Sequence, residues 1–235
     1  ENYGALSYLI ESIHEKGVMY TGSNDGKVHL TKDGGSTWTD VTPKGLPETL
    51  INAIEVSPHD PATVYLATTR YKFNDYQPGL YKSTNYGKSW KLITNGIPVG
   101  AYTKVVREDD VRKDLLFAGT VTGMYASWDG GLNWSPFQLN LPITPITDLA
   151  ISHGNVVVAT QGRSFWILDD LALLRQYDGT MGKGNLYTPA PTYIVNWSSQ
   201  LNGEGSDGTS ILSGVNPASG MVLYYDLPVL DEEME

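Results

Sequence analysis

The chain has 235 residues, of which 16 are Lys or Arg and 26 are Asp or Glu, so its formal net charge is −10. This acidic balance argues against a general nucleic-acid surface, and the absence of cysteine excludes disulfides and thiolate metal sites. No apolar run approaches the roughly 18 residues of a membrane span. We therefore expect neither a nucleic-acid partner nor a membrane-spanning segment.

The predicted strands recur in chain order as four similar units. Within a unit, a β-rich run ends in small residues, as in "VMYTGS" (18–23), "VYLATT" (64–69) and "LLFAGT" (115–120). An apolar strand opens the first unit at 5–12, and similar strands open the later units at 51–57, 102–108 and 146–152. The fourth unit continues as "VVVATQGRSFWILDD" (156–170). Turn signals separate these runs, which predicts four short strands in each unit.

An eight-residue motif follows the third predicted strand of the first three units. It reads "TKDGGSTW" (31–38), "STNYGKSW" (83–90) and "SWDGGLNW" (127–134). Ser or Thr opens it, Asp or Asn stands third, Gly fifth and Trp eighth. The motif residues are Thr31, Asp33, Gly35 and Trp38; Ser83, Asn85, Gly87 and Trp90; and Ser127, Asp129, Gly131 and Trp134.

The motif is interpreted as the cap of a hairpin between the third and fourth strands. Gly supplies a positive φ, the acid or amide accepts backbone N–H groups, and the Trp covers the hairpin. Asn85 favours this structural role, because an amide cannot replace a carboxylate as a general base. In the fourth unit the motif is reduced to "LDD".

The repeat predicts an all-β chain built as a β-propeller of four-stranded antiparallel blades, because such blades repeat at roughly 45 residues. The four blades are expected at about 1–45, 46–98, 99–142 and 143–177. Residues 178–235 are expected to form a linker and a C-terminal extension. Residues 70–78 form an insertion between the second and third strands of the second blade.

The three motifs resemble the Asp-box, or BNR, repeats of sialidases, xyloglucan-cleaving glycosidases and sortilin-type propellers. The stretch "GRSFWILDD" (162–170) and the run "NPASGMVLYYDL" (216–227) are similar to bacterial sortilin-N-like proteins described as BNR-repeat glycosyl hydrolases. The resemblance implies a parent ring of about seven blades, a following β-sandwich of which this chain holds part, and a bacterial periplasmic, cell-surface or secreted location. It also implies an N-terminal propeller half, from the same parent protein or from another chain.

The candidate ligand-binding residues fall on one face of the ring, where the turns between second and third strands open. They are Arg70, Tyr71, Lys72, Asn74 and Tyr76 of the insertion, Gln161 and Arg163 of the fourth blade, and Lys104 of an inner strand. Lys104 and Asp148 are expected at equivalent inner-strand positions. Two structural alternatives remain open: the insertion is a tolerated loop extension, and Arg163 pairs with Asp169 or Asp170.

Catalysis would need two carboxyl groups roughly 5 to 10 Å apart across a glycosidic bond. The catalytic candidates are Asp25, Asp75 and Asp148. Arg107 and Arg112 are expected around a turn between first and second strands, so these blades cannot form the arginine cluster of a sialidase. His14, His59 and His153 fall in separate turns of the same kind and are expected to be solvated, so no metal site and no cofactor is predicted.

Three functions follow. The first is an exported binding or scaffold module that recognises a protein or glycan through its loop face. The second is a glycoside hydrolase of the BNR-repeat type. The third is a structural half-ring that another chain completes.

Overall fold

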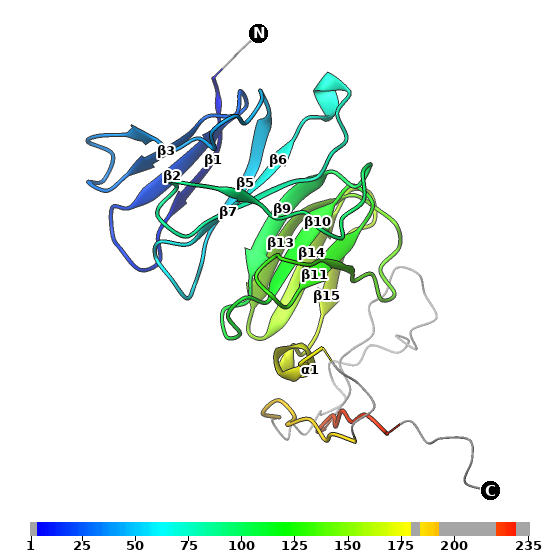
Figure 1. Ribbon diagram of the computed structural model, residues 1–235. Coiled ribbons are helices and arrows are strands. Elements are labelled where there is room, and N and C mark those ends of the chain that lie inside the picture. Colours follow the sequence, from blue (N-terminus) through cyan, green and yellow to red (C-terminus); the bar gives the residue numbers. More distant parts are fainter. Residues whose placement is uncertain (1–3, 180–183, 193–219, 229–235) are drawn as a thin grey trace, which may run out of the picture. The chain divides into compact units, whose positions relative to one another are not determined.

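A computed structural model describes residues 4–179, 184–192 and 220–228. The chain divides into two compact units, Glu1–Leu168 and Asp169–Glu235. The first unit is all-β and consists of four antiparallel sheets (Figure 1), which confirms the predicted propeller blades. Among the described residues, no helix has the length and apolar character needed to cross a membrane.

Each blade is a meander in which consecutive strands pair. Blade 1 contains β1 (Leu6–Glu11), β2 (Met19–Ser23), β3 (Val28–Thr31) and β4 (Thr39–Asp40). Blade 2 contains β5 (Leu50–Val56), β6 (Val64–Thr69), β7 (Gly79–Ser83) and β8 (Lys91–Leu92). Blade 3 contains β9 (Thr103–Glu108), β10 (Leu116–Thr120), β11 (Met124–Ser127) and β12 (Ser135–Pro136). The inner strands β1, β5 and β9 are neighbours in space, and the inner strand of blade 4 follows them.

Blade 4 has three strands in the described structure, so the prediction of four was wrong there. Its strands are β13 (Ile146–Ser152), β14 (Asn155–Thr160) and β15 (Phe165–Leu168). Without a hairpin motif after β15, the chain continues into a short helix, α1 (Ala172–Gln176), whose Leu, Ala, Arg and Gln residues favour a helix. The first compact unit ends at Leu168, and the propeller boundary expected at 177 stays a prediction.

Small residues in the second strand of a blade let the next blade approach closely. A methyl group added to Gly22 of β2 would come within 2.4 Å of Ile51 Cγ2, and one added to Gly119 of β10 within 2.6 Å of Ile146 Cγ2. Ala67 occupies the corresponding position of β6, since it pairs with the inner strand in the same register. The recurrent small residues therefore serve the packing between blades.

Every inner strand carries a one-residue irregularity at the same place. The extra residues are Ser7, Asn52, Lys104 and Thr147. Lys104 is therefore equivalent to Thr147, and the expected equivalence of Lys104 and Asp148 was wrong by one residue. Lys104 has no partner in the β9–β10 ladder, whereas Asp148 pairs with Ala159, so the two residues occupy different positions in their blades.

The hairpin motif spans the turn between β3 and β4 and its equivalents. The Asp33 carboxylate accepts the Thr31 hydroxyl at 2.8 Å, the Thr37 N–H at 2.9 Å and the Thr37 hydroxyl at 2.7 Å. These bonds, led by the Thr37 hydroxyl, lower the pKa of Asp33 to about 2. Asn85 accepts the Ser89 N–H at 2.9 Å in the same way. The arrangement supports the capping interpretation.

We predict that Asp129→Ala lowers the free energy of unfolding by about 1–2 kcal/mol, because the N–H of Asn133 and the hydroxyl of Ser127 lose their acceptor. Asp129→Asn is the matched control and should cost less than about 0.5 kcal/mol, since Asn85 fills the same role in blade 2. Urea unfolding of the three proteins measures both values. Equal losses for the two variants would contradict the capping role.

Of the three histidines predicted in turns between first and second strands, two link neighbouring blades and are not simply solvated. His14 Nε2 lies 2.9 Å from the Ser57 carbonyl, and His59 Nε2 lies 2.7 Å from the Asp109 carbonyl. Each ring donates to the corresponding turn of the next blade, because those turns stand side by side at one end of the ring. His153 Nδ1 lies 2.8 Å from the neighbouring Ser152 hydroxyl.

The described part of the second unit contains α1 and an isolated antiparallel bridge between Leu186 and Tyr225. Tyr187 N–H donates to the Tyr224 carbonyl at 2.9 Å beside this bridge. Most of the predicted linker and the start of the predicted β-sandwich, including 193–219 and 229–235, lie outside the described residues.

Candidate functional site: the loop face and the central arginine

The insertion between β6 and β7 folds into a compact loop. A single 3-10 turn, η1 (Tyr71–Phe73), opens it, and Asn74 ends this turn in the left-handed region with φ 57°. Arg70 Nε binds the Asp75 carboxylate at 2.8 Å, while its Nη1 donates to the Glu48 carbonyl at 2.8 Å. The salt bridge closes the loop and presents the residues between its two partners.

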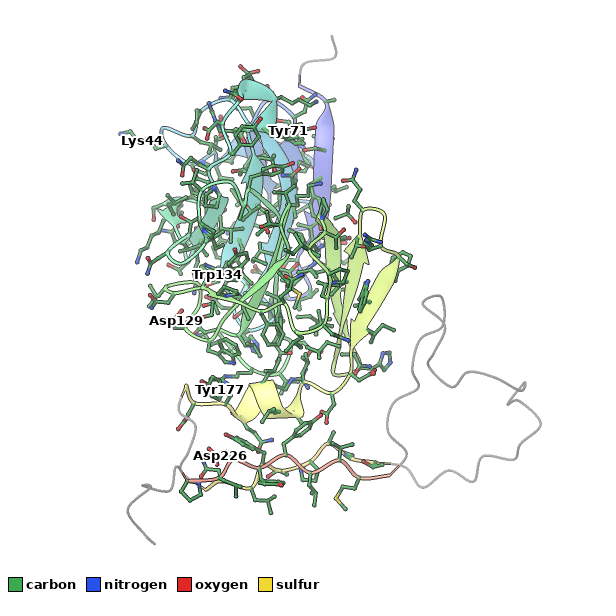
Figure 2. All side chains as sticks on the ribbon, turned by 90° about the vertical axis from the view of Figure 1, so that its right-hand side faces the viewer. Lys44, Tyr71, Asp129, Trp134, Tyr177 and Asp226 are labelled. Atoms are coloured by element: carbon green, nitrogen blue, oxygen red, sulfur yellow. The ribbon has the colours of Figure 1, made fainter. Side chains whose placement is uncertain are left out.

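The loop brings two of the predicted residues against a tyrosine of the next blade. Tyr71 stacks on Tyr102, with ring centroids 5.5 Å apart and an interplanar angle of 19°. Tyr76 lies 6.2 Å from Tyr102 on a tilted plane. Tyr71 and Tyr76 are 43% and 45% exposed. We call Tyr71, Tyr76 and Tyr102 the tyrosine cluster; Figure 2 shows Tyr71 toward the end of the blades opposite Asp129.

Tyr102 was missed at sequence level, although it directly precedes the inner strand of blade 3. Burial, followed by the neighbouring Tyr71 and Tyr76, raises the pKa of its hydroxyl. Lys104 stands two residues further on as the bulged residue of β9, and burial lowers the pKa of its ammonium. Within the described residues, no hydrogen bond or ion pair of Lys104 is present.

The other predicted binding residues are not members of the tyrosine cluster. Lys72 is exposed on η1, whereas Gln161 and Arg163 lie in the turn between β14 and β15. In that turn the Gln161 N–H donates to the Pro145 carbonyl, and the Arg163 carbonyl accepts Trp166 Nε1 at 2.8 Å. Among the described residues, no hydrogen bond joins this turn to the tyrosine cluster. The pairing of Arg163 with Asp169 or Asp170 stays a prediction.

The three candidate carboxylates are each held by local structure. Asp25 accepts the Ser23 hydroxyl within a blade 1 turn. Asp75 accepts Arg70 and the Gln77 N–H. Asp148 of β13 accepts Arg107 Nη2 at 2.9 Å and its own neighbour's N–H. Their hydrogen-bond partners differ, and among the described residues no hydrogen bond links one of these three carboxylates to another.

Arg107 joins the inner strands of all four blades. Its guanidinium lies 3.4 Å from the Glu55 carboxylate of β5 and 2.9 Å from Asp148 of β13. Nη2 also donates to the Tyr8 hydroxyl of β1 at 3.2 Å, and Nε donates to the Leu149 carbonyl at 2.9 Å. We call Tyr8, Glu55, Arg107 and Asp148 the central arginine cluster. Arg107 thus belongs to β9 and not to a turn.

The sequence contained a signal for this pairing. Glu55 and Arg107 occupy the same position in successive inner strands, since they pair with Tyr65 and Phe117 in equivalent registers. Opposite charges at one repeat position of adjacent blades indicate a contact between them. Aligning the repeats by strand register would have found it.

Burial raises the pKa of Glu55 to about 7, although the Arg107 charge opposes this change. The negative charges of Glu108 and Asp148 raise it further. The side chains of Glu55 and Arg107 are 16% and 13% exposed. They line a cleft of about 360 Å³ together with Asp148 and Glu108. One member of the central arginine cluster is therefore a carboxyl group that can change protonation near neutral pH.

No family model and no curated protein matches the chain. Several solved structures are similar in fold. Ycf48 from Cyanidioschyzon merolae is 17% identical over 72% of this chain and 54% of its own, with a TM-score of 0.53. A structure of Ycf48 bound to D1 peptide is 15% identical over 71% and 52%, also with a TM-score of 0.53.

Two glycosidases of family GH74 are similar as well. The enzyme from Niastella koreensis is 20% identical over 69% of this chain and 28% of its own, with a TM-score of 0.56. The xyloglucanase from Xanthomonas campestris is 16% identical over 69% and 29%, with a TM-score of 0.54. The chain therefore has the fold of a β-propeller and spans about half the length of the Ycf48 structures and less than a third of these enzymes.

Proposed function

We propose that the chain is a binding module that holds a protein or glycan ligand on its loop face. The tyrosine cluster carries this proposal. Two half-exposed rings, ordered by stacking on Tyr102 and by a closed salt bridge, offer a rigid apolar surface with polar hydroxyl edges. Such surfaces bind at low entropic cost, because the rings are already fixed before the ligand arrives.

The charges near this surface suit a polar ligand. Lys72 is exposed beside Tyr71, and Lys104 is a half-buried cation in the strand that follows Tyr102. The similar solved structures include both a peptide complex and xyloglucanases, so an extended peptide and a glycan are both reasonable probes. Membership of the Asp-box, sortilin-like proteins and an exported location are further parts of the proposal.

We predict that Tyr71→Ala weakens ligand binding about tenfold, which corresponds to about 1.4 kcal/mol, because the most regularly stacked ring is removed. Xyloglucan oligosaccharides and a peptide library serve as probes, and calorimetry measures the affinity of the best binder. Leu92→Ala is the control, since Leu92 is 52% exposed on the outer strand β8. The proposal fails if no probe binds, or if both variants bind as well as the unchanged protein.

A glycoside hydrolase is the second candidate, and the central arginine cluster is the observation that favours it. A glycosidase general acid needs a carboxyl group with a raised pKa and a second carboxylate nearby, and Glu55 and Asp148 share one guanidinium. Turnover of xyloglucan by the unchanged chain, lost in Glu55→Gln, would establish this function. Binding without turnover would favour the module.

A further inference from the structure

The cleft of about 360 Å³ beside Arg107 is strongly acidic. Five carboxyl groups line it, and they belong to Glu11, Glu55, Glu108, Asp110 and Asp148. Among the described residues that line this space, Arg107 is the one cation, and it pairs with Glu55 and Asp148. We call the space the acidic cleft. Because its carboxyl groups outnumber its cations, the acidic cleft attracts positive charge.

Apolar side chains form other parts of the wall of the acidic cleft. Ile13, in the turn after β1, is 72% exposed. The others include Ile10 and Ile151 of inner strands, Val56 at the end of β5 and Pro58 in the following turn. An alkyl chain can lie along such a wall while a charged group at its end reaches the carboxylates. The lining therefore favours a cation that carries an alkyl stem.

One carboxyl oxygen at the acidic cleft lacks a partner. Glu108 is 3% exposed at the end of β9, and its Oε1 accepts the Asp114 N–H at 2.9 Å. Its Oε2 is buried and has no hydrogen-bond partner among the described residues. The Tyr65 hydroxyl lies near the same carboxyl group but forms no hydrogen bond with Oε2. A buried carboxylate oxygen normally accepts a hydrogen bond, so Oε2 points to a donor that the described chain does not supply.

The fold does not require a carboxylate at the position of Glu108. Its equivalents in the other inner strands, four residues after each bulge, are Glu11, Val56 and Ile151. Glu11 accepts the Gly17 N–H at 2.8 Å, as Glu108 Oε1 accepts an N–H of its own turn. Val56 and Ile151 fill the same position with apolar side chains. The turn contact therefore explains Oε1 of Glu108 but leaves Oε2 without a structural role.

We propose that the acidic cleft binds a primary ammonium group on an alkyl stem, the chemistry of a lysine side chain or of a free alkylamine. The ammonium donates to Glu108 Oε2 and neutralises part of the charge of the other carboxylates, while the stem packs on the apolar wall. This site lies where β1, β5 and β9 end, whereas Tyr102 of the tyrosine cluster precedes β9. The inference therefore does not rest on the ligand proposed for the loop face or on turnover of a glycan.

Other cations fit the acidic cleft less well. A guanidinium group binds a carboxylate through two parallel N–H groups, but Glu108 Oε1 is already occupied, so one oxygen is left for it. An ammonium is a compact charge whose donors can meet a single oxygen. A bare metal ion needs several ligands around it, and among the described residues no group of three His, Cys, Asp or Glu side chains is arranged to hold one.

The affinity of the acidic cleft should depend on pH through Glu55. Burial raises the pKa of this carboxyl group to about 7, against the charge of Arg107. The other charged or titratable groups around it are Glu108, Asp148, Tyr65, Glu11 and Asp110. A bound ammonium favours the ionised form of Glu55, so the Kd should fall about tenfold from pH 6 to pH 8, where lysine stays protonated. Glu55→Gln should remove this dependence.

Amide chemical shifts of the full chain at pH 8 measure the binding. The probes are Nα-acetyl-lysine methylamide and Nα-acetyl-norleucine methylamide, which has a similar stem without the ammonium group. At about 10 mM probe, the lysine compound should shift the amides of Ile13, Asp110 and Ile151 saturably, and the norleucine compound should not. Equal shifts with both compounds, or no saturable shift of these amides, would overturn the inference.

Two further amines identify the source of the ammonium and test its shape. Cadaverine that binds as tightly as the lysine compound indicates a free alkylamine, and weaker binding indicates a lysine side chain of a polypeptide; either result supports an ammonium site. Nα-acetyl-arginine methylamide should bind about tenfold more weakly than the lysine compound. Equal affinity for the arginine compound would overturn the assignment to an ammonium.

Glu108→Gln tests the unpartnered oxygen, because glutamine keeps an Oε1 acceptor for the turn. The Kd for the lysine compound should rise about tenfold or more. Asp114→Asn is the matched control, since it removes the same charge from a side chain that lines a neighbouring cleft of about 210 Å³ and not the acidic cleft. Its Kd should stay within about twofold of the unchanged chain.

An unchanged Kd in Glu108→Gln, or equal losses in the two variants, would overturn the inference. If Glu108→Gln does not fold, the comparison of the lysine and norleucine compounds and the pH dependence decide, because both use the unchanged chain. A Kd that is the same at pH 6 and pH 8 would then count against the site.

Discussion

Arg107→Met is expected to lower the free energy of unfolding at pH 8 by about 3–5 kcal/mol, the cost of breaking a buried ion pair by removing one partner. The substitution leaves Glu55, whose side chain is 16% exposed, without its counter-charge. It also removes the donors to Asp148 and to the Leu149 carbonyl. Since these partners belong to different blades, the loss acts on the packing of the blades. Urea unfolding measures it.

Two controls separate the ion pair from a general effect of the substitution. Arg163→Met, in an exposed turn, should change the free energy of unfolding by less than about 0.5 kcal/mol. The double variant Arg107→Met with Glu55→Met should recover most of the loss, because an apolar pair of similar volume removes the uncompensated charge. A double variant as unstable as Arg107→Met alone would show that the Glu55 charge is not the cause.

The second large effect is a pH dependence that comes from Glu55. Its pKa rises from 4.5 to about 7 on folding, so between these values the folded chain keeps a proton that the unfolded chain releases. The contribution of Glu55 to the free energy of unfolding is therefore largest below pH 4.5. It decreases as the pH rises to about 7 and is constant above that pH. The expected decrease is about 3 kcal/mol.

Glu55→Gln isolates this contribution, because glutamine keeps the shape of the side chain and does not titrate. The difference in free energy of unfolding between this variant and the unchanged chain should grow in favour of the variant from pH 5 to pH 7.5. Urea unfolding at five pH values measures the difference. Parallel curves for the two proteins would contradict a raised pKa at Glu55.

The contacts that hold the blades together and the tyrosine cluster lie in different parts of the molecule. Hairpin motifs, histidine contacts and the hydrogen bonds of the Trp90 and Trp134 indoles to the preceding blade hold the blades together at one end and along the outside. The central arginine cluster holds the inner strands. Tyr71 and Tyr76 of the tyrosine cluster lie on an insertion that none of these contacts includes, so these two residues can change without loss of those contacts between blades.

Interactions between residues that are close in the chain could be predicted from the sequence alone. The hairpin motif, the four units and the insertion at 70–78 were predicted correctly, because a turn and its cap involve neighbours within about eight residues and repeat with the unit. The place of Tyr71 and Tyr76 on a loop between second and third strands followed from the same local pattern.

Contacts between blades needed the folded chain, because their partners are far apart in sequence and depend on strand register. Arg107 meets residues 41, 52 and 99 positions away, and a one-residue bulge separates Lys104 from the position of Asp148. Three tryptophans with the same motif also differ, since Trp90 and Trp134 meet a preceding blade and Trp38 does not. A repeated sequence specifies the same local turn each time, whereas its environment depends on which blade lies beside it.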